Sequence, residues 1–258
     1  MYDSLPRGLP GALGEDDARF SAPLLTVPEV GRNLLISSST VKDWKTSELV
    51  HAVTPVRRGA PSVPLAGVAE AQVLRGLRLS GLPPTEIARV TRSLREELGE
   101  YALIKERLAH DGRSIFRDVA RRTDAPQWVR VRDGQLLLPR IVDDHLTYLE
   151  WAPDGFPVRL RLRSYRQANA DVILDPGFGY GKPVFERTKV RTKDVMRQFL
   201  AGEKPEDIAS DYDLTEDEVL AAIRVLSGYR DAAGQRSWSI EPMGAGSLMH
   251  FGMLACRS

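Results

Sequence analysis

The chain has 258 residues, of which 28% are charged, and its formal net charge is only +1. A balance this even excludes an overall electrostatic attraction to nucleic acid, to membranes or to acidic substrates. The charge is uneven only locally: basic residues outnumber acidic ones from 105 to 140, and acidic residues dominate from 203 to 218. Two oppositely charged segments indicate two different partners.

Cysteine usage and hydropathy indicate the compartment. The single cysteine, Cys256, cannot form a disulfide within the chain and provides no metal cluster, which is typical of a reducing compartment. The first 19 residues lack an apolar run of signal-peptide length, and no segment has the apolar length that a membrane span requires. We therefore expect a soluble cytoplasmic protein.

The N-terminal quarter predicts two short helices after a flexible leader over 1–22, which is rich in glycine, proline and acidic residues. Thr26 is a typical N-cap and Glu29 completes a capping box, which predicts a helix that ends near 33–35. Residues 38–45 predict a second helix that turns Val41 and Trp44 inward. Two short helices across a tight turn are a helix-turn-helix.

The next segment adds a possible wing and further helices. Arg57 and Arg58 lie within the proline-containing stretch 46–64, where we expect a loop or wing. Helical spacing of apolar residues predicts helices over 68–79 and 84–98 and a shorter one over 101–108. We expect the arginines of the two longer helices to be solvated on their outer faces: Arg75, Arg78, Arg89, Arg92 and Arg95. These elements form a predicted domain over 23–110.

The pattern then changes from helical to alternating. Asp133-Gly134 and Asp154-Gly155 each lie between short apolar runs, which is typical of β-hairpins, and the second hairpin carries arginines on one face. We therefore predict a β-rich connecting region over 111–170.

The segment 171–228 predicts a brief strand at 184–185 and three capped helices. Thr192 caps the first helix, Pro205 opens the second, and Thr215 caps the third with Glu218 in the capping-box position. Residues 229–258 form a glycine- and methionine-containing tail. The predicted fold class is α+β and mostly helical, with a winged helix-turn-helix, a β-hairpin middle region and a C-terminal three-helix module.

Several blocks in 173–224 resemble the DUF433 family, whose small helix-turn-helix-like modules are associated with VapB-type antitoxins. The blocks occur in order: Asp175-Pro176, Gly181-Lys182-Pro183-Val184, the basic run 187–192, Phe199 to Ile208, and Tyr212 to Thr215. The region 26–100 resembles the winged helix-turn-helix of the MerR and excisionase kind. The quoted blocks there are Leu25 to Val30, Ser38 to Trp44 and Leu74 to Ile87.

Together the two resemblances imply an antitoxin of a type II toxin–antitoxin system. Such a protein neutralises a PIN-like ribonuclease toxin, represses its own operon by binding promoter DNA, and acts as a homodimer without a cofactor. The alternative is a stand-alone helix-turn-helix transcriptional regulator whose β-rich middle senses a ligand. The neighbouring gene distinguishes the two, because a short PIN-like gene supports the first.

The candidate DNA contacts lie on the second predicted helix and on the wing. We expect them to be Ser38, Ser39, Thr40, Lys42, Lys45, Arg57 and Arg58. The alternative for this helix pair is a corner that serves only for packing, since hydroxyl groups at a helix N-terminus cap the helix as readily as they bind phosphate.

The module's last helix begins with acidic residues, which repel phosphate, so we assign it to dimer or toxin contact. The candidate residues for that contact are Val219, Ile223, Trp238, Met249 and Phe251. The tail that carries the last three could instead complete the protein's own core. The four histidines are scattered and no nucleophile motif is present, so we expect no catalytic residues, no metal site and no enzyme activity.

Overall fold

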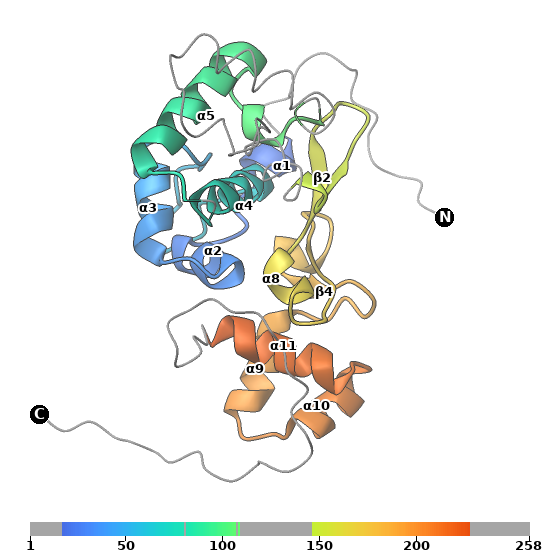
Figure 1. Cartoon of the computed structure of the whole chain (residues 1–258). Coiled ribbons are helices and arrows are strands. Elements are labelled where there is room, and N and C mark those ends of the chain that lie inside the picture. The colour runs from blue at the N-terminus through green and yellow to red at the C-terminus, as the bar shows by residue number, and fades with distance from the viewer. Residues whose placement is uncertain (1–16, 80, 107, 109–145, 228–258) are drawn as a thin grey trace, which may run out of the picture.

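The computed structural model describes residues 17–79, 81–106, 108 and 146–227. This part of the chain is α+β, about half helical, with one small antiparallel sheet (Figure 1). The predicted fold class is therefore confirmed. The hairpin predicted at Asp133-Gly134 lies outside the described residues.

The N-terminal half is built around one central helix, α4 (Leu65–Leu79). Every residue from Leu65 to Leu77 is buried, as expected for a helix that is covered on all sides. Its neighbours include α1 (Ala18–Ser21), α2 (Val27–Leu34) and α5 (Pro84–Leu98). α2 is followed by α3 (Ser38–Thr46), so the two short helices predicted at 26–35 and 38–45 are confirmed.

Three expectations for this half need correction. The leader predicted over 1–22 stops earlier, because α1 forms there and Phe20 is buried against Tyr101 and Phe156. The helix predicted from 68 begins at Leu65 instead. The helix predicted over 101–108 is interrupted: it begins as a 3-10 turn, η1 (Ala102–Ile104), Lys105 is extended, and Glu106 and Leu108 are helical again.

Tertiary contact explains the earlier start of α4. Gly67 lies directly under the backbone of His51, and a Cβ at this position would come within 2.1 Å of the His51 carbonyl oxygen. The glycine that lowers helix propensity at this point is thus required by a close backbone approach, which propensity alone does not predict.

The arginines predicted on solvated outer faces divide into two groups. Arg78 on α4 and Arg89 and Arg92 on α5 are exposed as expected. Arg75 is only 4% exposed, and Arg95 turns inward to the buried carboxylate of Glu70, with 3.3 Å between Nη2 and Oε1. Helical spacing alone could not separate these groups, because α4 is buried on every face from Leu65 to Leu77 and Arg95 reaches from α5 to a carboxylate buried in α4.

The sheet has the strand order β1-β2-β3-β4, with antiparallel neighbours. β1 (Leu149–Trp151) and β2 (Pro157–Arg161) form the hairpin predicted at Asp154-Gly155, and Gly155 adopts φ 76° in its turn. After the short helix α8 (Arg163–Arg166), β3 (Val172–Leu174) and β4 (Val184–Phe185) extend the same sheet. The sheet thus continues from the connecting region into the segment that resembles DUF433.

The C-terminal helices are α9 (Thr192–Leu200), α10 (Pro205–Tyr212) and α11 (Glu216–Leu226), so the three predicted helices are confirmed. The predicted cap Thr192 is instead the first residue of α9, and Arg191 is the N-cap without a side-chain cap hydrogen bond. They form a layer beside the N-terminal half, with α11 and α8 packed against α2 (Figure 1). One hydrophobic cluster runs from Phe20 in α1 to Val225 in α11. The two halves therefore share a core.

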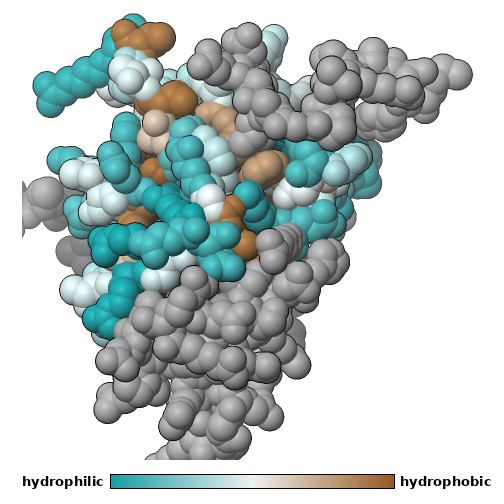
Figure 2. Space-filling model, turned by 90° about the horizontal axis from the view of Figure 1, so that it is seen from above, coloured by the Kyte–Doolittle hydropathy of each residue, from teal (hydrophilic) through white to brown (hydrophobic). Residues whose placement is uncertain are grey.

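The face opposite the C-terminal helices is mostly hydrophilic. Seen from above, the coloured surface shows hydrophilic residues around separate small hydrophobic areas (Figure 2). Isolated apolar residues on a surface are normal and do not indicate an interface.

Candidate nucleic-acid interface

The corner between α2 and α3 begins at a well-capped helix. Thr26 and Glu29 form a reciprocal capping box: the Thr26 backbone N–H donates to Glu29 Oε2 at 2.8 Å, and the Glu29 N–H donates to Thr26 Oγ1 at 3.3 Å. α2 ends at Leu35, a non-glycine residue in the left-handed conformation with φ 52°. The left-handed residue turns the chain sharply into α3.

The turn itself is closed by backbone hydrogen bonds. The Ile36 N–H donates to the Gly31 carbonyl at 2.9 Å, and Ser37 caps α3 by accepting from the Thr40 N–H at 3.2 Å. A Cβ on Gly31 would lie 2.9 Å from the Ile36 carbonyl oxygen, so this close approach favours glycine. The corner is therefore well defined by local contacts.

The structure separates the predicted DNA contacts on α3 into two groups. Ser38, Ser39 and Lys42 are exposed. Thr40 is buried, and its hydroxyl accepts a hydrogen bond of 2.8 Å from Arg78. Lys45 is half-buried, and its ammonium donates to Ser62 Oγ at 3.0 Å. The first group is placed to contact a partner, whereas Thr40 and Lys45 hold α3 on the protein.

The predicted wing is a loop. Arg57 and Arg58 are exposed in a turn that the Ala60 N–H closes by donating to the Arg57 carbonyl at 3.0 Å. The residues between α3 and α4 form no strand, apart from an isolated bridge between Leu25 and Val63. The expectation of a strand-built wing is corrected to an exposed basic loop.

A buried carboxylate that sequence reasoning missed holds the chain after α3. Glu70 in α4 accepts a 2.6 Å hydrogen bond from the His51 N–H, and Arg95 donates to the backbone carbonyls of Glu48 and Leu49. Burial raises the pKa of Glu70 to about 7, despite the opposing hydrogen bond from His51 and the charge of Arg95. The sequence feature that could have predicted this buried carboxylate is the single glutamate within the apolar run of α4.

A second corner, between α10 and α11, has the same backbone plan. α10 has eight residues, like α2, and ends at Asp213, which is left-handed with φ 52°. The Leu214 N–H donates to the Ala209 carbonyl at 2.9 Å, and Thr215 caps α11 in a capping box with Glu218. The chain therefore contains two corners of one construction.

Counting from these turns pairs the two corners residue by residue. Val41 and Val219 occupy equivalent positions and are both fully buried. The exposed face of α3 and its equivalent on α11 differ completely in chemistry: Ser38, Ser39 and Lys42 correspond to Glu216, Asp217 and Leu220. The same backbone thus presents hydroxyls and a cation at one corner, and carboxylates and an apolar side chain at the other.

The residues predicted for dimer or toxin contact are only partly available. Val219 is fully buried in the core, so its assignment to a partner surface is corrected to a packing role. Ile223 is half-buried and packs against the core. Trp238, Met249 and Phe251 lie outside the described residues.

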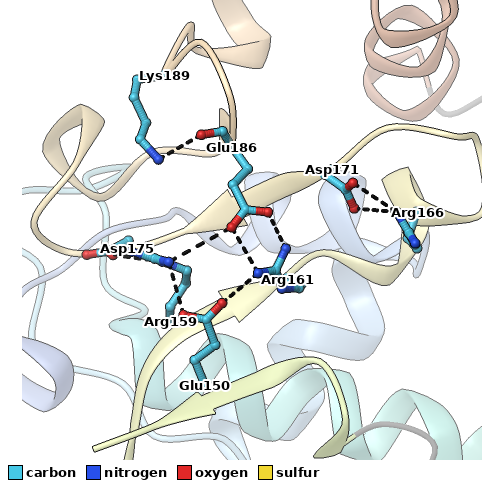
Figure 3. Close-up of polar contacts among 8 residues, drawn as sticks. All are labelled: Glu150, Arg159, Arg161, Arg166, Asp171, Asp175, Glu186 and Lys189. Atoms are coloured by element: carbon cyan, nitrogen blue, oxygen red, sulfur yellow. Dashed lines mark hydrogen bonds and ion pairs between the residues drawn. The ribbon is translucent and has the colours of Figure 1, made fainter.

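The arginine face predicted for the second hairpin is neutralised. Arg159 and Arg161 in β2 lie between Glu150 in β1 and Glu186 beyond β4, and Arg159 also pairs with Asp175 at 3.0 Å (Figure 3). Because each guanidinium has at least two carboxylate partners, this face offers little net positive charge. This face is therefore a poorer candidate for phosphate binding than the exposed cations Lys42, Arg57 and Arg58.

Polar contacts join the first corner to the C-terminal half. Asn33 in α2 is buried, and its Oδ1 accepts a 2.9 Å hydrogen bond from the hydroxyl of Tyr165 in α8. Ser164 donates to the Asn33 carbonyl, and Lys182 donates to the Leu24 carbonyl at 2.7 Å. These contacts, which sequence reasoning missed, fix the corner relative to the segment that resembles DUF433.

The described residues contain no group of three or more histidine, cysteine, aspartate or glutamate side chains that could hold a metal ion. In the same part of the chain, no helix combines the length and apolarity needed to cross a membrane.

Comparison with known proteins identifies the family. Residues 172–224 match the family described as "Protein of unknown function (DUF433)". A Mycobacterium tuberculosis protein named "Putative antitoxin VapB45" is 31% identical over 235 residues, which cover 83% of this chain and 98% of that protein. The crystal structure of Rv2018 from Mycobacterium tuberculosis is also similar, with a TM-score of 0.69 and 31% identity over 80% of this chain and 99% of that one. The chain therefore belongs to the same family as the protein named "Putative antitoxin VapB45", and its own residues 172–224, which match DUF433, include β3, β4 and the C-terminal helices.

Proposed function

We propose that this protein is the antitoxin of a type II toxin–antitoxin pair, which neutralises a PIN-like ribonuclease toxin and binds the promoter DNA of its own operon as a repressor. The observation that carries the antitoxin role is the similarity to the VapB45 antitoxin along nearly the full length of that relative. Such a role is regulatory rather than enzymatic, and it is exercised in the cytoplasm, where both toxin and promoter are found.

The promoter-binding part of the proposal rests on the α2–α3 corner. A second helix that enters the major groove contacts base edges and phosphates mainly through its N-terminal residues. Ser38, Ser39 and Lys42 are exposed on the first turns of α3, where hydroxyls, backbone N–H groups and a cation can meet phosphate. Arg57 and Arg58 in the exposed loop add two more candidates for backbone contact.

Helix-turn-helix repressors bind pseudo-palindromic sites as dimers, with half-sites about one helical turn apart. We therefore propose a homodimer that places one α3 in each half-site. A single corner carries too little positive charge to bind tightly by electrostatics alone, since the whole chain has a net charge of only +1.

Two experiments test the proposal separately. Co-expression of the full chain with the product of the neighbouring gene should restore growth that this product alone arrests, and the two should co-purify. A mobility-shift titration with the operon promoter should give a discrete complex that shuffled DNA competes poorly. Promoter binding without any toxin next door would favour a stand-alone regulator, and absence of both activities would refute the proposal.

A further inference from the structure

A buried ion pair adjoins the chain segment that follows α3. The side chain of Glu70 in α4 is fully buried, and Arg95 in α5 approaches it with 3.3 Å between Nη2 and Oε1. The cost of taking two charges out of water often exceeds their mutual attraction, so apolar residues at such positions commonly give equal or greater stability. The pair is therefore better explained by what it holds in place than by its contribution to stability.

The pair holds the short segment that directly follows α3. Glu70 accepts a 2.6 Å hydrogen bond from the His51 N–H. Arg95 donates to the Glu48 carbonyl and, at 3.3 Å, to the Leu49 carbonyl. Because the carboxylate belongs to α4 and the guanidinium to α5, this segment is held by two helices at once.

The held segment joins the two elements that are candidates for DNA binding. At its start, the Leu49 and Val50 N–H groups donate to the Trp44 carbonyl at 2.8 and 3.3 Å, at the end of α3. Beyond it the chain enters the loop that exposes Arg57 and Arg58. A binding site functions only when its groups are held to within roughly 0.5 Å of the productive geometry. A shift of this segment would therefore move α3 and the loop relative to each other.

We propose that Glu70 and Arg95 are positioning residues for promoter binding, and that recognition of the promoter requires the charged form of Glu70. This inference rests on the proposed function. Glu70 cannot contact DNA because it is fully buried, and Arg95 is bonded to the protein's own carbonyl groups. Sequence-specific binding should therefore depend on the pair, whereas the general attraction between the protein and DNA should not.

The surroundings of Glu70 place its titration near neutral pH. Burial raises the pKa of Glu70 to about 7, although the hydrogen bond from His51 and the charge of Arg95 oppose the rise, and Glu100 adds a smaller upward effect. The other titratable groups nearby are the His51 imidazole, whose Nδ1 lies 3.9 Å from Glu100 Oε1, and the phenol of Tyr101. Protonation of Glu70 removes its attraction for Arg95, so the segment after α3 is released as the pH falls through 7.

Promoter affinity and stability should therefore respond to pH in opposite directions. The folded-state pKa of Glu70 lies above its ordinary 4.5, so its contribution to stability is lost as the pH rises through 7. The charged form positions α3, so the affinity for the promoter should rise about fivefold between pH 6 and pH 8. A residue that served stability alone would make both quantities fall together.

The test measures the affinity of the full chain for the operon promoter and for shuffled DNA between pH 6 and pH 8. Glu70→Gln keeps an acceptor for the His51 N–H but carries no charge, so its promoter affinity at pH 8 should be about tenfold below that of the wild type. The fivefold rise with pH should also be absent. Affinity for shuffled DNA should stay within about twofold of the wild type, which distinguishes a positioning defect from general unfolding.

Arg92 provides a matched control for Arg95. The two arginines lie about one turn apart on α5, but Arg92 is exposed, whereas Arg95 reaches Glu70. Arg95→Met and Arg92→Met each remove one positive charge from the same helix. Arg95→Met should lower promoter affinity about tenfold, whereas Arg92→Met should lower the affinity for promoter and shuffled DNA alike, by about twofold or less.

Three results would overturn the positioning role while leaving promoter binding intact. These are a wild-type promoter affinity that does not change between pH 6 and pH 8, a Glu70→Gln profile that keeps the rise, and equal losses in Arg92→Met and Arg95→Met. The wild-type profile alone provides the test if a variant fails to fold. Absence of a discrete promoter complex with the wild-type chain at every pH would instead refute the proposed promoter binding, and the positioning role with it.

Discussion

The α2–α3 and α10–α11 corners have the same backbone and opposite surface chemistry. Each consists of an eight-residue helix, a left-handed residue, one apolar residue and a hydroxyl N-cap before the second helix. The exposed first turn is Ser38-Ser39 at one corner and Glu216-Asp217 at the other. The comparison teaches that the shape of a helix-turn-helix does not establish what it binds, since charge is set independently of the turn.

The two corners also differ in how they are held. At the position where α3 has Trp44, α11 has Ala222, and at the position where α2 has buried Asn33, α10 has exposed Asp211. The first corner is therefore anchored by a large side chain and a polar junction, whereas the second relies on small residues and close helix packing. Each difference can be tested by substitution at equivalent positions.

The largest expected effect is at Trp44. Replacing Trp44 with alanine should lower the free energy of unfolding by about 3–5 kcal/mol, because the indole is buried and its removal leaves a cavity. The equivalent change at the second corner, Ala222→Gly, should cost only about 1–2 kcal/mol, from helix propensity and the loss of one buried methyl group. Urea denaturation measures both, and equal losses would contradict the proposed difference in anchoring.

The pH dependence of stability tests the chain segment after α3. Glu70 has a pKa of about 7 in the folded protein, above its ordinary 4.5, so the folded state holds this proton more tightly than the unfolded chain. Its contribution to stability is therefore greatest below pH 4.5 and is lost as the pH rises towards 7. Glu70→Gln should remove a pH-dependent term on the order of 3 kcal/mol from denaturation curves recorded between pH 5 and pH 8.

The control for this prediction is Glu96→Gln on the exposed surface of α5, which should leave the pH profile unchanged. A Glu70→Gln profile parallel to that of the wild type would show that the carboxylate does not titrate in this range.

Loss of the hydrogen bond between Tyr165 and Asn33 should have an intermediate effect on the free energy of unfolding. Tyr165→Phe removes the hydroxyl that donates to Asn33 and leaves a buried amide oxygen without that donor, so we expect a loss of about 1–3 kcal/mol. Asp211→Ala, at the position equivalent to Asn33, should change stability by less than about 0.5 kcal/mol because it is exposed. Thermal unfolding distinguishes these values, and similar losses from both changes would argue that the two corners are held alike.

The smallest effect should be shared by the two corners. Ser37→Ala and Thr215→Ala each remove the side chain that caps the second helix, and each should cost about 1 kcal/mol. Chemical denaturation of the two variants should give similar values. A large difference between them would show that the corners are less alike than their backbones indicate.

Much of the fold could be predicted from the sequence because its signals are local. The capping residues at Thr26 and Thr215 and the Asp154-Gly155 turn depend only on neighbours in the chain, and the structure confirms these elements. The DUF433 resemblance is also confirmed by the match over 172–224.

The roles of individual side chains were harder to predict because burial depends on residues distant in sequence. The sequence predicts that Thr40 and Lys45 contact DNA, but in the structure they are hydrogen-bonded to Arg78 and Ser62. It also predicts that Val219 contacts a partner, but this residue lies in the core. Helical spacing indicates which residues share a face of a helix, but it does not indicate whether that face meets solvent or protein.

The central claim, that charge directs promoter DNA to the first corner and not to the second, is tested most directly by the salt dependence of DNA binding. For the full chain, the plot of log binding constant against log salt concentration should have a slope less negative by about one per protomer in Lys42→Ala, together with weaker binding. The Glu216→Gln/Asp217→Asn variant should keep the wild-type slope. An unchanged slope in Lys42→Ala, or a change confined to the α11 variant, would contradict the account.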